Sequence, residues 1–195
     1  MPNNKFLGLY RQADFRTRAV EDSEDMIIEG YFVVFDQPYI MGDWGEEYVA
    51  RGAFDGCDMT DVRALIDHRP ELVLGRSTAD TLTLSIDDTG LFCSVRVNSR
   101  DTDAVNLHAR VQRGDVNQAS FGFDEGEVTY TDLADGRVRR TINQVSKLYE
   151  VSVCTFPAYE QTYVSARSAA AEDVKKAVEN RRREKLKRRF RHHER

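Results

Sequence analysis

The chain has 195 residues and a net charge of −5, and 41% of its residues are hydrophobic and 10% aromatic. This composition supports a hydrophobic core and excludes global disorder. No apolar run approaches the roughly 18 residues of a membrane span, and the N-terminus lacks the apolar stretch of a signal peptide. We therefore expect the protein to stay in the cytoplasm in which it is made.

The charge is distributed unevenly along the chain. Residues 167–195 carry twelve Lys and Arg against five Asp and Glu, a net charge of +7, which leaves −12 for residues 1–166. The basic segment has few apolar residues and cannot bury much surface. The sequence therefore predicts one folded domain over 1–166 and a basic tail over 167–195, either a solvated helix or disordered. No internal repeat is visible.

The cysteines favour neither a disulfide framework nor a zinc site. The chain has an odd number of cysteines, and no two of them form a CxxC pair; they are Cys57, Cys93 and Cys154. We expect reduced, mostly buried thiols, and no metal or cofactor.

The first quarter of the chain predicts β-strands separated by irregular segments. A partly exposed strand is expected over 6–20, and the clearest strand, rich in β-branched and aromatic residues, over 26–35. An irregular loop follows over 39–44. A strand over 46–50 is then expected to turn into a short helix over 51–55.

The next stretch alternates apolar and polar residues, which indicates strands. The expected strands are 62–66, 72–76, 81–86 and 91–97. His68 lies just beyond the end of the first, and Pro70 keeps a helix from following it.

The period changes to that of a helix from Thr102, with Asp101 or Thr102 as N-cap and Gly114 as the residue that ends it. Strands are expected again over 118–123, 127–130, 137–145 and 148–156. About eight strands and one clear helix predict a mainly β fold with helices (α+β), closed or nearly closed into a β-barrel on which the helices pack.

The strand around Ser120 is a candidate for chemistry. Ala119, Phe121 and Phe123 would share one face of it, while Ser120 and Gly122 point the other way. Buried phenyl rings would hold the hydroxyl rigidly, and the glycine would leave space beside it. Most strand serines are only polar surface residues, however, and a serine needs a base to become a nucleophile.

Four histidines could supply that base. His108 lies on the apolar side of the expected helix and is interpreted as a packed core residue. His192 and His193 belong to the basic tail and are interpreted as solvated. His68 ends a strand in a polar setting, where a lone histidine is usually structural or incidental.

Several segments together resemble a known family. They are 52–55, 62–76, 113–123 and 148–158. In this order and with this spacing they resemble the prohead maturation proteases of tailed bacteriophages, from about residue 27 to 163. That family consists of serine endopeptidases distantly similar in fold to herpesvirus assemblins.

The resemblance implies roles for three residues. The family's histidine falls on His68 and its serine on Ser120, and Glu150 is the best match for the third member of the triad. His68 would act as general base toward Ser120. Glu150 would fix the imidazole tautomer and stabilise the imidazolium.

Two features of the expected site stay open. Glu150 should share a strand face with Leu148 and Ser152, but Asp124 or Glu125 could supply the third group instead. The oxyanion donor is equally open, because assemblins use an arginine loop that follows the triad and no Arg-Arg pair stands between Glu150 and the tail. Arg139 and Arg140 precede Glu150, and backbone N–H groups are an equal alternative.

The resemblance also implies partners and a place of action. The expected substrates are the major capsid protein and its scaffold segments, cut inside the assembling prohead in the host cytoplasm, and the enzyme is expected to cut itself. A homo-oligomer is left open, and neither membrane nor nucleic acid is an expected partner.

Other functions remain as alternatives. One is a non-enzymatic capsid scaffolding or assembly protein in which Ser120 and His68 are structural. Another is a nucleic-acid-binding module that uses the basic tail, whose cations would give salt-dependent phosphate affinity. The acidic body argues against that module. A cysteine protease is disfavoured because no thiol shares a motif with His68.

Overall fold

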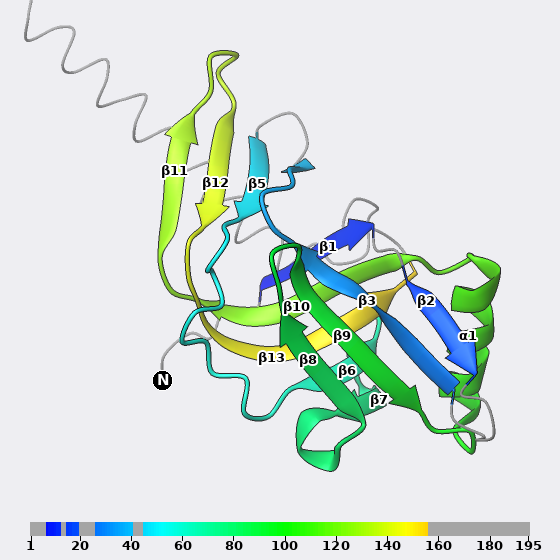
Figure 1. The fold of residues 1–195 in the computed structure, drawn as a ribbon. Helices are drawn as coiled ribbons and strands as arrows, with labels where there is room; N and C mark the ends of the chain where they lie inside the picture. The colour runs from blue at the N-terminus through cyan, green and yellow to red at the C-terminus, as the bar shows by residue number, and fades with distance from the viewer. Residues whose placement is uncertain (1–6, 13–14, 20–25, 41–44, 156–195) are drawn as a thin grey trace, which may run out of the picture.

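The computed structural model describes residues 7–12, 15–19, 26–40 and 45–155. Three β-sheets and one α-helix make up this part of the chain (Figure 1). The predicted tail at 167–195 and the predicted domain boundary before it lie outside the described residues.

The first sheet has five strands and carries the candidate nucleophile. Its order is β1 (Leu7–Gln12), β10 (Gln118–Glu125), β13 (Val145–Cys154), β6 (Arg63–Ile66) and β7 (Arg69–Arg76). All neighbours pair antiparallel except β13 and β6, which are parallel.

The other two sheets have four strands each. One has the order β2 (Arg16–Ala19), β3 (Met26–Val34), β9 (Gly90–Val97) and β8 (Leu82–Ile86). The other has the order β11 (Val128–Asp132), β12 (Val138–Ile142), β5 (Gly45–Val49) and β4 (Tyr39–Ile40). The β11–β12 hairpin stands at one end of the molecule and the helix at the other (Figure 1).

The expectation of a closed or nearly closed barrel is wrong, although the mainly β character is confirmed. A barrel requires the hydrogen-bonded ladder to continue until the last strand pairs with the first. In the described chain the ladder breaks into three sheets, and no pairing joins β1 to β7, β2 to β8 or β11 to β4. One α-helix, rather than several, packs on the sheets among these residues. Alternating apolar residues suit packed sheets as well as a barrel, so the pattern could not separate the two.

The core lies between the five-stranded sheet and the β2–β3–β9–β8 sheet. One cluster of buried side chains includes Phe32 from β3, Leu91 from β9 and Phe121 from β10. Phe121 and Phe123 stack with ring centroids 4.6 Å apart, as expected for residues on one strand face. Phe54 adds a third ring, 6.2 Å from that of Phe121. The aromatic cluster anchors β10 from the side opposite Ser120.

The helix α1 (Thr102–Arg113) has the predicted residues at both of its ends, Asp101 as N-cap and Gly114 as C-cap. The Asp101 carboxylate accepts hydrogen bonds from two backbone N–H groups of the first turn, and Gly114 ends the helix with a φ of 84°. His108 lies on the buried face, as predicted, and burial lowers its pKa from the ordinary value of 6.5.

Other expectations for local structure need correction. The segment after β5 forms successive tight turns through residue 56 instead of a short helix. The expected first strand divides into β1 and β2, and the strand expected over 137–145 ends at Ile142 because Val145 already begins β13. A further single turn of 3-10 helix, η2 (Ser77–Ala79), follows β7.

The three thiols are unpaired, as expected. Cys93 and Cys154 are buried, and Cys57 is partly buried with its pKa raised by burial to about 11. Within the described ranges, no helix is long and apolar enough to cross a membrane.

Candidate active site

Ser120 occupies the middle of β10, between two neighbouring strands. On one side it pairs with Ser152 of β13, and two residues further on Gly122 pairs with Glu150. Paired residues of antiparallel strands point to the same face. Ser120, Gly122, Glu150 and Ser152 therefore share the face opposite the Phe121 ring.

The Ser120 hydroxyl is fully buried, and its Oγ has no hydrogen-bond partner among the described residues. Most buried hydroxyls are bonded, so this one is unusual. Within the part of the chain that the structure describes, no acceptor takes its proton.

A β-bulge in β13 follows directly on the Glu150 side of this face and reverses the alternation beyond it. Gly122 pairs with Glu150, but the next residue, Phe123, pairs with Leu148, so Tyr149 is the extra residue. Leu148 consequently joins the core, and the expectation that it shares the face of Glu150 is wrong. A strict period of two could not reveal this, because the bulge reverses the alternation.

His68 stands in a strained two-residue turn. Asp67 and His68 connect β6 to β7 with φ values of 48° and 58°, the left-handed pair that a type I′ hairpin requires. The end of β13 holds this turn. The Asp67 carboxylate accepts hydrogen bonds from Thr155 N at 2.7 Å and Thr155 Oγ1 at 3.1 Å, and Asp67 N donates to the Val153 carbonyl at 3.0 Å. Such strain persists only where the surroundings over-determine it.

His68 and Glu150 are in direct contact. His68 Nδ1 lies 2.6 Å from Glu150 Oε1, and the two side chains are 12% and 4% exposed. A carboxylate at this distance holds the imidazole with its proton on Nδ1, so that Nε2 is the basic nitrogen. The second oxygen, Oε2, accepts a hydrogen bond from Ser152 Oγ at 2.5 Å.

The structure thus brings His68 and Glu150 together and puts Ser120 on the adjacent strand. Ser152 links them, since it lies opposite Ser120 in register and its Oγ accepts a hydrogen bond from His68 N at 3.2 Å. Sequence reasoning did not assign a role to Ser152 or Asp67. Their only signals are the Glu-x-Ser spacing, which puts both residues on one strand face, and the position of Asp67 directly before His68.

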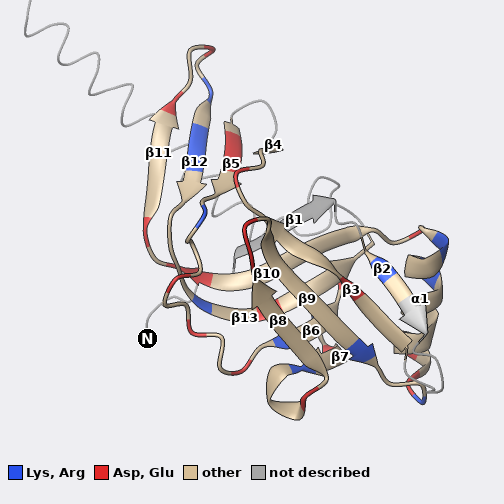
Figure 2. Cartoon of the chain, in the orientation of Figure 1, with Lys and Arg blue, Asp and Glu red and all other residues tan. Residues whose placement is uncertain are grey.

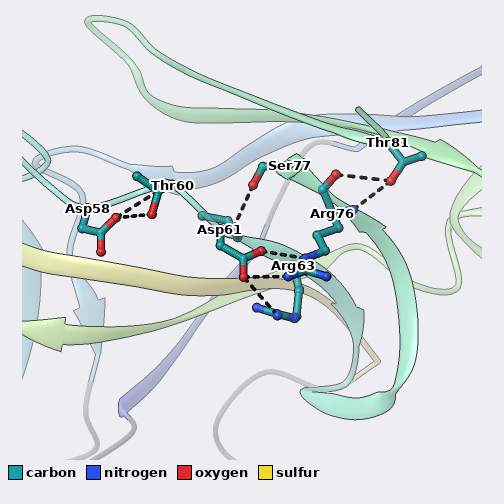
Figure 3. A network of polar contacts seen from close by, with 8 residues as sticks. Asp58, Thr60, Asp61, Arg63, Arg76, Ser77 and Thr81 are labelled. Atoms are coloured by element: carbon teal, nitrogen blue, oxygen red, sulfur yellow. Dashed lines mark hydrogen bonds and ion pairs between the residues drawn. The ribbon is translucent and has the colours of Figure 1, made fainter. Parts of the chain in front are cut away.

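A polar network secures the opposite end of the β6–β7 hairpin (Figure 3). Asp61 accepts two hydrogen bonds from Arg76, at 2.7 and 2.8 Å, and one from Arg63 at 3.1 Å. The Arg76 contact is the main cause that lowers the pKa of Asp61 to about 2. Ser77 Oγ accepts from Val62 N at 2.9 Å. These bonds join the residues just before β6 to the end of β7 and to Ser77 after it. They therefore help to fix the register of the β6–β7 hairpin, and with it the position of its turn.

The two arginines that the sequence offers as oxyanion donors, Arg139 and Arg140, form ion pairs elsewhere. Arg139 pairs with Glu46, and the buried Arg140 pairs with Glu47 and Glu125. Figure 2 shows the basic side chains of β12 beside the acidic side chains of β5, the strand with which β12 pairs.

The alternative third groups are likewise engaged elsewhere. Asp124 accepts a hydrogen bond from the Tyr149 hydroxyl at 2.5 Å, and Glu125 is paired with Arg140. Of the three acidic candidates, Glu150 is the one in contact with His68.

A buried hydroxyl, an imidazole and a carboxylate held on adjacent elements of one sheet are the residue set of a serine hydrolase. Comparison with known sequences narrows this class. The family described as Caudovirus prohead serine protease matches residues 13–177, and the chain belongs to that family. The resemblance identified in the sequence is thereby confirmed.

Two individual proteins are similar to this chain. The prohead protease of Enterobacteria phage HK97 is 32% identical over 149 residues, which are 74% of this chain and 61% of that protein. The chain therefore spans about three-fifths of the length of this curated relative. The solved structure of the bacteriophage T4 capsid assembly protease covers 76% of this chain and 96% of its own, with 13% identity and a TM-score of 0.48.

Proposed function

We propose that this chain is a serine endopeptidase that cuts the major capsid protein and its scaffold segments, and also itself, inside the assembling prohead in the host cytoplasm. Membership of the prohead protease family supports the class of reaction and the class of substrate. The single observation that carries the assignment of residues is the 2.6 Å contact between His68 Nδ1 and Glu150 Oε1, beside the strand of Ser120.

The chemistry follows from this arrangement. Ser120 Oγ attacks the scissile carbonyl carbon while its proton passes to Nε2 of His68. The tetrahedral intermediate collapses as Nε2 gives that proton to the leaving amine, and the acyl group stays on Ser120. Water then attacks the ester by the same route, with His68 again as base, and restores the hydroxyl. The Glu150 carboxylate accepts the Nδ1–H hydrogen bond and stabilises the imidazolium.

Backbone N–H groups are the proposed oxyanion donors. Arg139 and Arg140 are committed to carboxylates of β5 and β10, and moving Arg140 would break its ion pair with the buried Glu47, at high cost. Oxyanion donors must be in place before charge develops, which favours fixed backbone groups over side chains that would have to leave an ion pair.

Labelling with a fluorophosphonate tests the nucleophile. The probe should attach to Ser120 in the wild-type protein and to no residue of Ser120→Ala. That substitution removes a hydroxyl without a hydrogen-bond partner among the described residues, so the free energy of unfolding should change by less than about 1 kcal/mol.

Incubation with the cognate capsid precursor, followed by mass spectrometry, tests the substrate. Wild type should release defined fragments and Ser120→Ala none. A scaffolding protein or a nucleic-acid-binding module would be neither labelled nor able to cut. Cleavage by purified Ser120→Ala would end the assignment of Ser120.

A further inference from the structure

The Ser152 hydroxyl is bonded both to the backbone of the proposed base, His68, and to the carboxylate of Glu150. Ser152 is fully buried on β13 and pairs with Ser120 across the strands. Its neighbours along the strand, Val151 and Val153, point into the core. Ser152 therefore places a polar group on the same sheet face as Ser120 and Glu150.

Both hydrogen bonds of this hydroxyl go to groups of the site. Oγ donates its one proton to Glu150 Oε2 at 2.5 Å and accepts from the backbone N–H of His68 at 3.2 Å. Because the proton goes to Glu150, a lone pair of Oγ faces the His68 backbone. The carboxylate is thus held at one oxygen by Ser152 and at the other by the imidazole.

A purely structural explanation is that Ser152 only satisfies buried polar groups. Burying a hydroxyl costs free energy unless it is bonded, and two bonds remove that cost. This explanation does not require both partners to belong to the site. Here one partner is the backbone N–H of His68, in the strained turn between β6 and β7. The other is the Glu150 carboxylate, which must lie where it can bond the His68 imidazole.

We infer that Ser152 is a positioning residue of the proposed protease, one that fixes the Glu150 carboxylate and the His68 backbone relative to each other. The inference rests on the proposed function. Without the hydroxyl, Glu150 Oε2 loses a donor and His68 N loses an acceptor. The carboxylate can then rotate, and the imidazole is held less firmly in the orientation that a general base needs.

Three variants test this inference. Ser152→Ala removes both bonds, Ser152→Thr keeps a hydroxyl and suits a β-strand, and Ser94→Ala is a matched control on β9 of a different sheet, where the hydroxyl donates to Glu29 at 3.5 Å. For each variant kcat and KM are measured with one capsid-precursor peptide. In parallel, proton NMR follows the His68 Nδ1 proton, whose resonance moves far downfield when it is donated to a carboxylate.

Ser152→Ala should lower kcat roughly 10- to 100-fold, the loss expected for a hydrogen bond to a charged group, while KM changes little. Its Nδ1 proton should move upfield or broaden. Ser152→Thr should restore most of the wild-type kcat and most of the downfield shift of the Nδ1 proton. Ser94→Ala should match wild type in both measurements.

The inference is overturned if folded Ser152→Ala keeps the wild-type kcat and the wild-type Nδ1 resonance. It is also overturned if Ser152→Thr folds but loses as much kcat as Ser152→Ala, since the hydroxyl would then not be the relevant group. Failure of the proposed function is a different result, namely wild type that neither cuts the precursor nor takes the label. The NMR comparison does not depend on activity and separates the two.

Discussion

Replacing Glu150 by Gln gives the sharpest test of the site. The substitution keeps the shape of the side chain but turns one acceptor oxygen into an NH₂ donor. In the wild type both carboxylate oxygens accept, one from His68 Nδ1 at 2.6 Å and the other from Ser152 Oγ at 2.5 Å. The amide has only two arrangements, and each disrupts one of these bonds.

If the NH₂ group faces His68, it donates to Nδ1 and moves the imidazole proton to Nε2. His68 can then no longer take the proton of Ser120. If the amide oxygen faces His68, the NH₂ group faces Ser152 Oγ, which must stop donating to residue 150 and needs a new acceptor. In both arrangements the negative charge that stabilises the imidazolium is gone.

The expected result is a fall in kcat of about 10³–10⁴-fold, equivalent to about 4–5.5 kcal/mol of transition-state stabilisation. Turnover of a capsid-precursor peptide measures the loss, and thermal unfolding checks that the variant is folded. Asp124→Asn and Glu125→Gln are the controls, because these carboxylates contact Tyr149 and Arg140 instead of the imidazole. Near-normal turnover in Glu150→Gln, together with a severe loss in either control, would refute the assignment of Glu150.

Three further results are expected. Asp67→Ala should lower the free energy of unfolding by about 1–2 kcal/mol in chemical denaturation, because it removes the hydrogen bonds from Thr155 and puts alanine at a φ of 48°. Asp67→Asn should keep most of the stability, and equal losses in the two variants would contradict this explanation. His108 has a pKa below 6.5 in the folded protein, so below that pH the unfolded chain binds more protons and stability falls with acidification, by at most about 1.4 kcal/mol per pH unit. His108→Leu should therefore show a smaller loss of unfolding free energy between pH 7 and pH 5, and an unchanged loss would remove His108 as its source. Mass spectrometry should find a self-cleaved product ending near residues 160–170, and a chain truncated after Arg167 should still cut peptides but enter proheads poorly; loss of its peptidase activity would place the tail within the folded domain.

The sequence by itself determined the local structure to a large extent. The period of 3.6 and the caps at Asp101 and Gly114 predicted α1, since capping depends only on neighbouring residues. The alternation around Ser120 predicted the stacked Phe121 and Phe123 beneath it. His68 and Ser120 could be singled out only because their surrounding segments resemble a family as a set.

Tertiary structure decided which distant residues meet. The strand pattern did not distinguish a barrel from three sheets, because alternation records which face is buried and not which strand lies alongside. The bulge at Tyr149 reversed the face of Leu148, and no local signal marks it. The contact between His68 and Glu150 spans 82 residues of sequence and exists because β6 runs parallel to β13 in one register. Ser152 gains its proposed role in the same way. Its hydroxyl reaches the backbone of His68 only because β13 pairs with β6 of the β6–β7 hairpin.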